Sequence, residues 1–405
     1  MYVALDQTSV TAYVRQSPLW ASLFDQAEDL EGEDLADGNI NLVFRVYSRS
    51  DRSRSAIIKQ ALPWSRRYPE IILPLDRIRI EHDAMQVQSR YCAECVPRIY
   101  HYDPEMYLIV MEDLNRHVVM RLGLMEQTIY PRFAAHIGRF AAQTLFHTSG
   151  FFLDASEKKT MVARFINPAM CRITEDLVFT HPWREHSGNR NNPLIAREAA
   201  HLRSDGELCA EVLRLKNCFM CHAEALVHGD LHTGSIMVNR EETKVFDSEF
   251  AFYGPMGFDI GAILANLILS YASQEWFARD PLLRVRYREW LLETIAAVWN
   301  VFEAEFCRLW EEDGNGEWPS PLFRRRFLGN LLRDSAGYAG CKIIRRILGL
   351  AHVPDLEAIP DLEARASAER LALAVAREWL VNNRRFATVS DMLELVGAAE
   401  AAPHC

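Results

Sequence analysis

The sequence predicts an α+β protein of two lobes, in which a small antiparallel sheet precedes a larger, mainly helical part. Up to about residue 111, short runs alternate apolar and polar positions and are separated by turn residues, as in strands. From about residue 121, apolar residues recur at helical spacing. The length of 405 residues also exceeds the size at which a single core usually suffices.

The first lobe is expected to have a β-β-α-β-β order. Residues 39–48 and 55–60 alternate as two strands joined by a polar turn. A loop containing three prolines follows, and residues 75–91 then carry one apolar face, which predicts a helix. Residues 96–103 and 106–114 predict another strand pair around an Asp-Pro turn.

The second lobe is expected to be helical with short strands inserted. Residues 130–150 predict a long helix ending at a glycine, and the chain beyond Gly257 is helical in pattern except at 311–321. Residues 226–239 and 243–252 contain apolar runs that predict short strands. We therefore expect an N-terminal lobe with a leading helix over residues 1–111, a linker at 112–120 and a helical lobe over 121–405.

Composition narrows the class of protein. The net charge of -10 argues against nucleic acid or an anionic membrane as the main partner. No apolar run reaches the roughly 20 residues that span a bilayer, and the N-terminus lacks a signal-peptide pattern, so a cytoplasmic protein is expected. The nine cysteines include C-x-x-C pairs at Cys92/Cys95 and Cys218/Cys221. A four-thiolate zinc site is one reading, but packing as small apolar residues is the preferred one.

Lysine is rare in this chain, which contains 39 arginines and six lysines. Lys59 is the only lysine among the first 157 residues and ends the apolar strand "AIIKQ". Arginine is a planar fork and lysine a compact point charge, so Lys59 could occupy a place that arginine cannot fill, although chance would also leave one lysine. Glu81 lies 22 residues later on the predicted helix. A strand lysine paired with a helix glutamate is how kinases hold nucleotide phosphates, and an ordinary surface pair is the alternative.

Two backbone segments of the first lobe could contact a nucleotide. The turn in "DGNINLVF" can place backbone N–H groups over phosphates, although ordinary hairpin turns look the same. The segment "VMEDL" ends the sheet lobe, so the chain crossing there would offer backbone groups to an adenine edge. The candidate residues are Gly38, Asn39 and Asn41 in the turn, and Glu112, Asp113 and Leu114 at the crossing.

Acidic residues follow two of the short strands of the helical lobe. "HGD" at 228–230 places Asp230 in a loop, where its carboxylate could accept the proton of an attacking alcohol. Seventeen residues downstream, Asp247 and Glu249 follow another apolar strand. Being two apart, they would point the same way on a strand, and paired carboxylates suit Mg²⁺. Each acidic residue alone is typical of a solvated turn; their order after Lys59 and Glu81 favours phosphoryl transfer.

This order of elements resembles the aminoglycoside/choline phosphotransferase branch of the protein-kinase-like superfamily, in which the loop reads H-G-D. More narrowly, long stretches between residues 37 and 353 resemble the methylthioribose kinases, so the likeness covers nearly the whole chain. These stretches are "DGNINLVF", "IIKQALPW", "VMEDL", "FINPAMCRITEDLVFT", "LVHGDLHTGSIMVN", "FAFYGPMGFDIGAILANLILSY" and "GYAGCKIIRRILGLAHV".

The resemblance implies a bilobal protein-kinase-like fold and a role for each matching residue. Asp230 would be the catalytic base on a sugar hydroxyl, and Arg345 and Arg346 would lie near the acceptor sugar and the transferred phosphate. Without the resemblance, these arginines would be assigned to a helix C-terminus, where they offset the helix dipole. Asp259 would brace the catalytic loop. ATP would be held at its phosphates by Asn41 and Lys59 and at its adenine by residues 112–114, with Mg²⁺ on Asp247 and Glu249 and with Ser248 between them.

The chain departs from related patterns at two serines. Ser235 stands where protein kinases place the asparagine that binds a second metal ion, and serine there is typical of the methylthioribose kinases. Ser248 replaces the proline that the family usually has between the metal ligands, which frees one backbone angle and restores an N–H group. Because the change at Ser248 removes no predicted ligand, activity is still expected.

The resemblance implies an ATP- and Mg²⁺-dependent kinase that phosphorylates the anomeric hydroxyl of 5-methylthioribose in methionine salvage, acting as a homodimer. One alternative is another phosphotransferase of the same fold that acts on choline, homoserine or an aminoglycoside, and the acidic net charge would suit a cationic acceptor. A second alternative is an inactive nucleotide-binding regulator, which the presence of Asp230, Asp247 and Glu249 disfavours.

Overall fold

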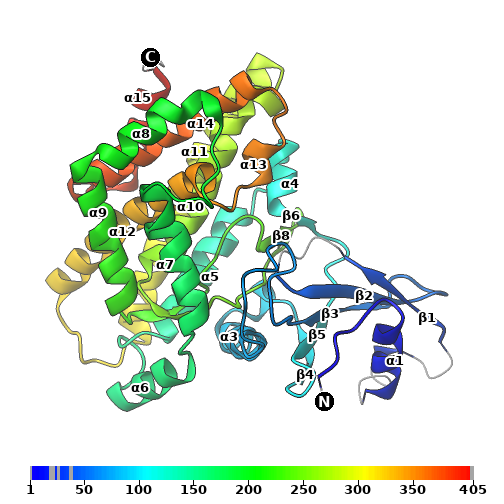
Figure 1. The fold of residues 1–405 in the computed structure, drawn as a ribbon. Helices are drawn as coiled ribbons and strands as arrows, with labels where there is room; N and C mark the ends of the chain where they lie inside the picture. Colours follow the sequence, from blue (N-terminus) through cyan, green and yellow to red (C-terminus); the bar gives the residue numbers. More distant parts are fainter. Residues whose placement is uncertain (1, 18–22, 25–27, 36–39, 402–405) are drawn as a thin grey trace.

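A five-stranded antiparallel sheet forms the N-terminal part of the protein (Figure 1). The computed structural model describes residues 2–17, 23–24, 28–35 and 40–401. The strand order is β1-β2-β3-β5-β4, so the predicted strand pairs meet through β3 and β5, where Lys59 lies opposite Ile109. The strands are β1 (Leu30–Asp34), β2 (Leu42–Ser48), β3 (Ser55–Gln60), β4 (Ile99–Asp103) and β5 (Leu108–Glu112).

The strand β1 was missing from the prediction. Its sequence, "LEGED", carries one large apolar residue and three acidic residues, so it lacks the alternation of a half-buried strand. It forms because it pairs in register with the edge of β2, from Leu30 opposite Ser48 to Asp34 opposite Phe44. The four predicted strands are confirmed, with β2 beginning at Leu42.

The two faces of this sheet are covered by different helices. Ile58 and Val110 belong to a small core with Val10 and Val14 of helix α1 (Ser9–Gln16). Ile109, which points to the other face, joins the large core that continues into the helical part. Helix α3 (Arg77–Tyr91), predicted at 75–91, packs on the strands β4 and β5. The sheet is therefore tied to the helices through α3.

The C-terminal part is helical, and its centre is α10 (Gly257–Phe277), whose residues are all buried through Gln274. It crosses α12 at very short range, since a Cβ on Gly261 would lie 2.6 Å from the carbonyl oxygen of Ser335. The remaining helices are α4 (Met120–Met125), α5 (Phe133–His147), α6 (Ala155–Arg164), α7 (Pro168–Phe179), α8 (Ala196–Ser204), α9 (Gly206–Cys221), α11 (Pro281–Glu312), α12 (Pro321–Leu348), α13 (Pro354–Glu357), α14 (Leu362–Asn382) and α15 (Val389–Ala401).

Two small sheets flank the segments with the predicted acidic residues, and Figure 1 shows β6 and β8 of one of them where the five-stranded sheet meets the helical part. The strand β7 (Ala225–Val227) pairs with β10 (Phe252–Gly254). A second sheet has the order β6-β8-β9, with β6 at Val118–Val119, β8 at Ile236–Val238 and β9 at Thr243–Val245. The short strands expected within 226–239 and 243–252 are thus confirmed. Across the described ranges, no helix has the length and apolar character needed to cross a membrane.

Candidate active site

The predicted lysine–glutamate pair is present at the centre of the sheet. Lys59 Nζ lies 2.8 Å from Glu81 Oε1, and the two side chains are 7% and 0% exposed. Lys59 also contacts the carboxylate of Asp247, which comes from the helical part of the protein. Burial lowers the pKa of Lys59, but Asp247 and Glu81 outweigh it and raise the pKa above its ordinary value. Lys59 is therefore a permanent buried cation between the two parts of the chain.

Three carboxylates gather beside this lysine. Oxygen atoms of Glu81, Asp247 and Glu249 all lie within 4.8 Å of one another. Burial raises the pKa of Glu81 to about 7, with Lys59 opposing this effect. Mg²⁺ prefers such hard oxygen donors, one or two of them from protein carboxylates. The donor set of this cluster fits a divalent cation held between Asp247 and Glu249.

Asp247 and Glu249 converge, but the prediction that they do so by lying on one strand is wrong. The strand β9 ends at Val245, and Asp247 has a φ of 70°, so the pair does not lie on a strand. Aspartate is one of the few residues that adopt this left-handed conformation without great cost. The turn directs Asp247 toward Lys59, and Glu249 is held separately. Ser248 between them is buried, and its hydroxyl has no hydrogen-bond partner within the described part of the chain.

Glu249 is anchored by Arg77, a residue that the sequence reasoning missed. Arg77 Nε donates to Glu249 Oε2 over 3.0 Å, and its Nη2 donates to Asn41 Oδ1 over 2.6 Å. Asn41 Nδ2 in turn donates to Glu249 Oε2 over 3.0 Å. Arg77 is 1% exposed and begins α3, where a sequence pattern alone suggests an ordinary surface position. Asn41, just before β2, and Arg77 of α3 therefore meet at the carboxylate of Glu249, one of the two predicted metal ligands.

Of the two predicted nucleotide-binding segments, the turn before β2 is described only in part, whereas residues 112–114 are described in full. Gly38 and Asn39 lie outside the described residues. Glu112 is the last residue of β5, where it lies opposite Ala56. The Asp113 carboxylate accepts hydrogen bonds from Arg45 Nε at 2.7 Å and Ser55 Oγ at 2.6 Å, and the Leu114 carbonyl accepts one from the His117 N–H at 2.9 Å.

The loop after β7 is held rigidly by two neighbours. Asp259, near the start of α10, accepts hydrogen bonds from the backbone N–H groups of His228 at 2.6 Å and Gly229 at 3.0 Å, which confirms its predicted bracing role. His228 Nδ1 accepts from the Asp230 N–H at 3.3 Å, so Nε2 carries the proton and donates to the Phe246 carbonyl at 2.9 Å. His228 thus ties the Asp230 loop to the segment that carries the predicted metal ligands Asp247 and Glu249.

Asp230 lies within this loop, beside two cations and a histidine. Its Oδ1 is 3.0 Å from Lys342 Nζ, and its Oδ2 is 3.2 Å from His232 Nε2 and 3.8 Å from Arg346 Nη2. Burial alone would raise the pKa of Asp230, but Lys342, His232 and Arg346 hold it well below its usual range. The carboxylate is therefore ionised at neutral pH and available to accept a hydrogen bond from an alcohol.

The second histidine of the loop, His232, is a neutral hydrogen-bond donor. Its Nδ1 accepts from the Gly234 N–H at 3.0 Å, so the proton lies on Nε2, which faces Asp230. Burial lowers the pKa of His232 to about 4, although Asp230 opposes the shift. Ser235 Oγ donates to the Asp230 carbonyl at 3.2 Å. Ser235 therefore supports the backbone of the loop.

Arg345 and Arg346 are buried near the last turn of α12, with 7% and 8% exposure. Arg346 approaches Asp230, and its Nη1 donates to the Ala351 carbonyl at 3.2 Å. Arg345 Nε has no hydrogen-bond partner among the residues described, although it is buried. Burial lowers the pKa of both arginines. Two buried guanidinium groups beside a carboxylate, one with an unused donor, fit a site for an anionic group better than a solvated helix end.

Sequence reasoning also missed Arg121, Asp355 and Lys342. Arg121 Nε lies 2.7 Å from Asp355 Oδ2, and both side chains interact electrostatically with Arg346. Arg121, Lys342, Arg345 and Arg346 are thus four cations around two carboxylates. The carboxylates are those of Asp230 and Asp355. Lysine rarity, the signal that drew attention to Lys59, would have identified Lys342, one of only six lysines. Arg121 and Asp355 carry no such signal.

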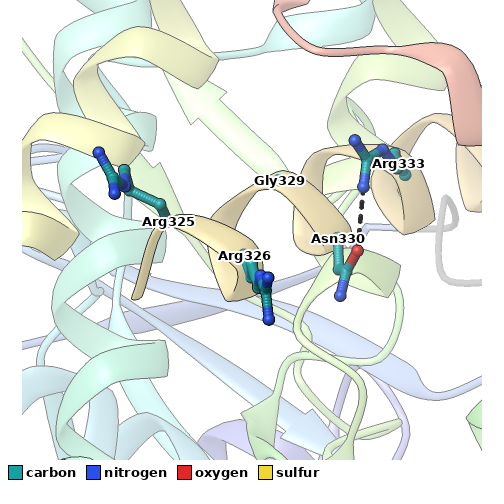
Figure 2. A pocket seen from close by; sticks show the side chains of 5 residues that line it. All are labelled: Arg325, Arg326, Gly329, Asn330 and Arg333. Atoms are coloured by element: carbon teal, nitrogen blue, oxygen red, sulfur yellow. Dashed lines mark hydrogen bonds between the residues drawn. The ribbon is translucent and has the colours of Figure 1, made fainter. Parts of the chain in front are cut away.

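Other candidate features lie apart from these residues. Cys92, Glu94 and Cys95 come together after α3, whereas Cys218 and Cys221 end α9, so four thiolates do not form one cluster within the described segments. A shallow pocket on α12 is lined by three arginines, as Figure 2 shows. Its last arginine, Arg333, precedes Arg345 by 12 residues, or about 18 Å along the helix.

Comparison with known sequences agrees with this geometry. The profile of the phosphotransferase enzyme family matches residues 31–299. The fold, the buried lysine–glutamate pair and the two acidic centres therefore define a phosphotransferase.

Full-length relatives narrow the class further. Methylthioribose kinase 1 of Oryza sativa subsp. japonica is 41% identical over 407 residues, which cover 96% of this chain and 94% of that protein. Methylthioribose kinase of Geobacillus kaustophilus is 39% identical over 380 residues, covering 93% of each chain. The chain belongs to the methylthioribose kinase family. A solved choline kinase from Cryptosporidium parvum matches with a TM-score of 0.47 and 14% identity, over 98% of this chain and 100% of that chain.

Proposed function

We propose that this protein transfers the γ-phosphoryl group of ATP to the anomeric hydroxyl of 5-methylthioribose and so forms the 1-phosphate in methionine salvage. The observation that carries this proposal is the ionised Asp230 beside Arg346 and Lys342, in a loop that His228 ties to the Asp247–Glu249 segment. The names of the full-length relatives support the acceptor.

The nucleotide would bind between the sheet and the helical part. Lys59 would contact its phosphates, with Glu81 fixing the ammonium group. Asn41 would approach the phosphates through its backbone, because its side chain is bonded to Glu249 and Arg77. Backbone groups of residues 112–114 would meet the adenine edge, which makes residues 112–120 the proposed boundary between an N-terminal lobe and a C-terminal lobe.

Mg²⁺ would be held by Asp247 and Glu249, whose oxygens already lie close together. When bound, the ion would neutralise charge on the nucleotide phosphates. The residues of this chain prepare that site: Lys59 holds Asp247, and Arg77 and Asn41 hold Glu249. Ser248 lies buried between the two ligands.

The transfer itself would require little proton chemistry. The acceptor oxygen bonds to the γ-phosphorus, the bond from this phosphorus to the bridging oxygen of ADP breaks, and the hydroxyl proton passes to Asp230. Because its pKa is held below the usual range, Asp230 is a weak base. A weak base suits a loose transition state, in which the proton leaves the hydroxyl late. Arg345 and Arg346 would stabilise the transferred group, whose charge spreads over its equatorial oxygens.

The charge around Asp230 distinguishes possible acceptors. Arg121, Lys342, Arg345 and Arg346 outnumber the nearby carboxylates, so a cationic acceptor such as choline would be repelled. ATP consumption should therefore be measured with methylthioribose, choline, homoserine and kanamycin at equal concentrations. We expect turnover with methylthioribose to exceed the others clearly, and equal activity on choline would overturn the proposal.

A homodimer in the cytoplasm completes the proposal. Three exposed apolar side chains near the start of α11, Leu282, Leu283 and Val285, support an interface in the helical part. Light scattering on the purified protein should give twice the chain mass of 46.5 kDa, and a monomer at micromolar concentration would contradict this assembly.

A further inference from the structure

Lys342 is the least exposed cation beside the predicted base. It lies on α12, far along the chain from the loop at 228–235, and its side chain is 4% exposed. Its Nζ is 3.0 Å from Asp230 Oδ1 and 4.1 Å from the centroid of the Phe258 ring. A buried ammonium group loses its hydration, so it persists only where a carboxylate and an aromatic face replace the water.

Because Lys342 contacts only one carboxylate oxygen of Asp230, the two oxygens have different neighbours. Oδ1 is held by the ammonium of Lys342, whereas Oδ2 faces His232 Nε2 at 3.2 Å and Arg346 Nη2 at 3.8 Å. A carboxylate offers about four lone-pair sites, so these contacts leave capacity for an acceptor hydroxyl. The contact with α12 fixes the rotation of the carboxylate, because Lys342 and the Asp230 loop belong to different elements.

We propose that Lys342 is a positioning residue for Asp230, which holds Oδ1 and so fixes the carboxylate in the orientation that receives the acceptor hydroxyl. This inference rests on the proposed phosphoryl transfer, in which Asp230 receives the proton. It also explains why the position is a lysine in a chain so rich in arginine. A compact ammonium fits between the Phe258 ring and Oδ1, whereas a planar guanidinium would need more room and different angles.

The ionisation of Lys342 gives the proposal a pH signature. The charged groups that face it are Asp230, Asp259, Arg345 and Arg346. Burial lowers the pKa of Lys342 to about 8, and the two arginines add to this effect while Asp230 opposes it. The ammonium is therefore present below about pH 8 and is lost as the pH rises through that value. We expect kcat/KM for the acceptor to fall on this alkaline side.

The first test is Lys342→Met, compared with the wild type over pH 5 to 10. We expect kcat to fall about 10²-fold, with the KM of the acceptor and of ATP changed less than about threefold. The pKa of Asp230 should rise without its cation, so the acid limb should move to higher pH and the limb near pH 8 should vanish. A kcat within threefold of wild type, or an unchanged pH profile, would overturn the proposal.

A second variant and a control guard against simple loss of structure. Lys342→Arg keeps a cation with a high pKa, so it should retain more activity than Lys342→Met. The alkaline limb of its pH profile should move to higher pH. An alkaline limb that does not move would contradict the proposal, even if Lys342→Met does not fold. Lys216→Met is the matched control, because the one hydrogen bond of Lys216 Nζ to the described residues is with the Thr180 hydroxyl, at 3.0 Å. Each variant is measured with whichever acceptor the wild type uses. Failure of methylthioribose as the acceptor would thus overturn the proposed function without obscuring the Lys342 result.

Discussion

Asp230 owes its chemistry to its neighbours. Buried carboxyl groups usually become weaker acids, but the cations around Asp230 reverse this tendency and keep it ionised. The same neighbours orient it, since donors from the loop and from α12 contact different oxygens. Its role in the proposed transfer is to align the hydroxyl and to receive its proton late.

The substitution Asp230→Asn tests this role directly. The amide keeps the size of the side chain but cannot take up the proton, so turnover should fall by about 10³-fold. ATP binding, followed by calorimetry, should stay within about threefold of wild type because Lys59 and Glu81 are untouched. Asp29→Asn, at an exposed ion pair, serves as the control. Turnover close to wild type would refute the assignment of Asp230.

Lys59 allows a test of why lysine is retained in an arginine-rich chain. Its ammonium fits between Glu81 and Asp247 with 7% exposure, and a guanidinium would have to displace one of them. Lys59→Arg should therefore raise the KM of ATP by about tenfold or more in steady-state assays, although the charge is unchanged. Lys244→Arg, at the one half-buried position of β9, should leave the KM unaltered. An ATP KM for Lys59→Arg equal to that of wild type would show that charge alone suffices.

The loop between β7 and β8 depends on one glycine. Gly229 has a φ of 85°, and a Cβ there would lie 2.2 Å from the carbonyl oxygen of Phe250. Only glycine combines this dihedral angle with this contact.

Gly229→Ala should lower the free energy of unfolding in urea by at least about 2 kcal/mol and should also reduce turnover, because the next residue is Asp230. Gly206→Ala, where a Cβ meets no atom within 4 Å at the start of α9, should leave both quantities near wild type. Equal stability of the two variants would contradict the strain described for Gly229.

Whether a helix or strand could be predicted from the sequence depended on how regular its pattern of apolar residues is. The strands β2, β3, β4 and β5 and the helix α3 were predicted because each buries a regular face. The strand β1 was not, since its pairing with β2 rather than its own composition creates it. The left-handed turn at Asp247 has no sequence pattern of its own, because the apolar run predicts a strand that in the structure already ends at Val245.

At the scale of the whole molecule, the site is assembled from distant segments. Lys59, Arg77 and Glu81 come from the sheet and α3, and they meet Asp247 and Glu249 from the helical part. Sequence order predicted Lys59, Glu81 and the three acidic residues because each lies on or soon after a recognisable element. It could not predict Arg77 or Lys342, whose partners lie 172 and 112 residues away. Such contacts exist only once the two parts of the chain have packed together.

The most direct test of the central claim is the position of the new phosphate. The protein should be incubated with MgATP and methylthioribose, and the product examined by ³¹P NMR, with the 1-deoxy analogue of the sugar as the control. The account predicts a phosphomonoester signal split by the single anomeric proton, and no product from the analogue. A phosphate on any other carbon, or ATP hydrolysis without sugar phosphorylation, would contradict the proposed function.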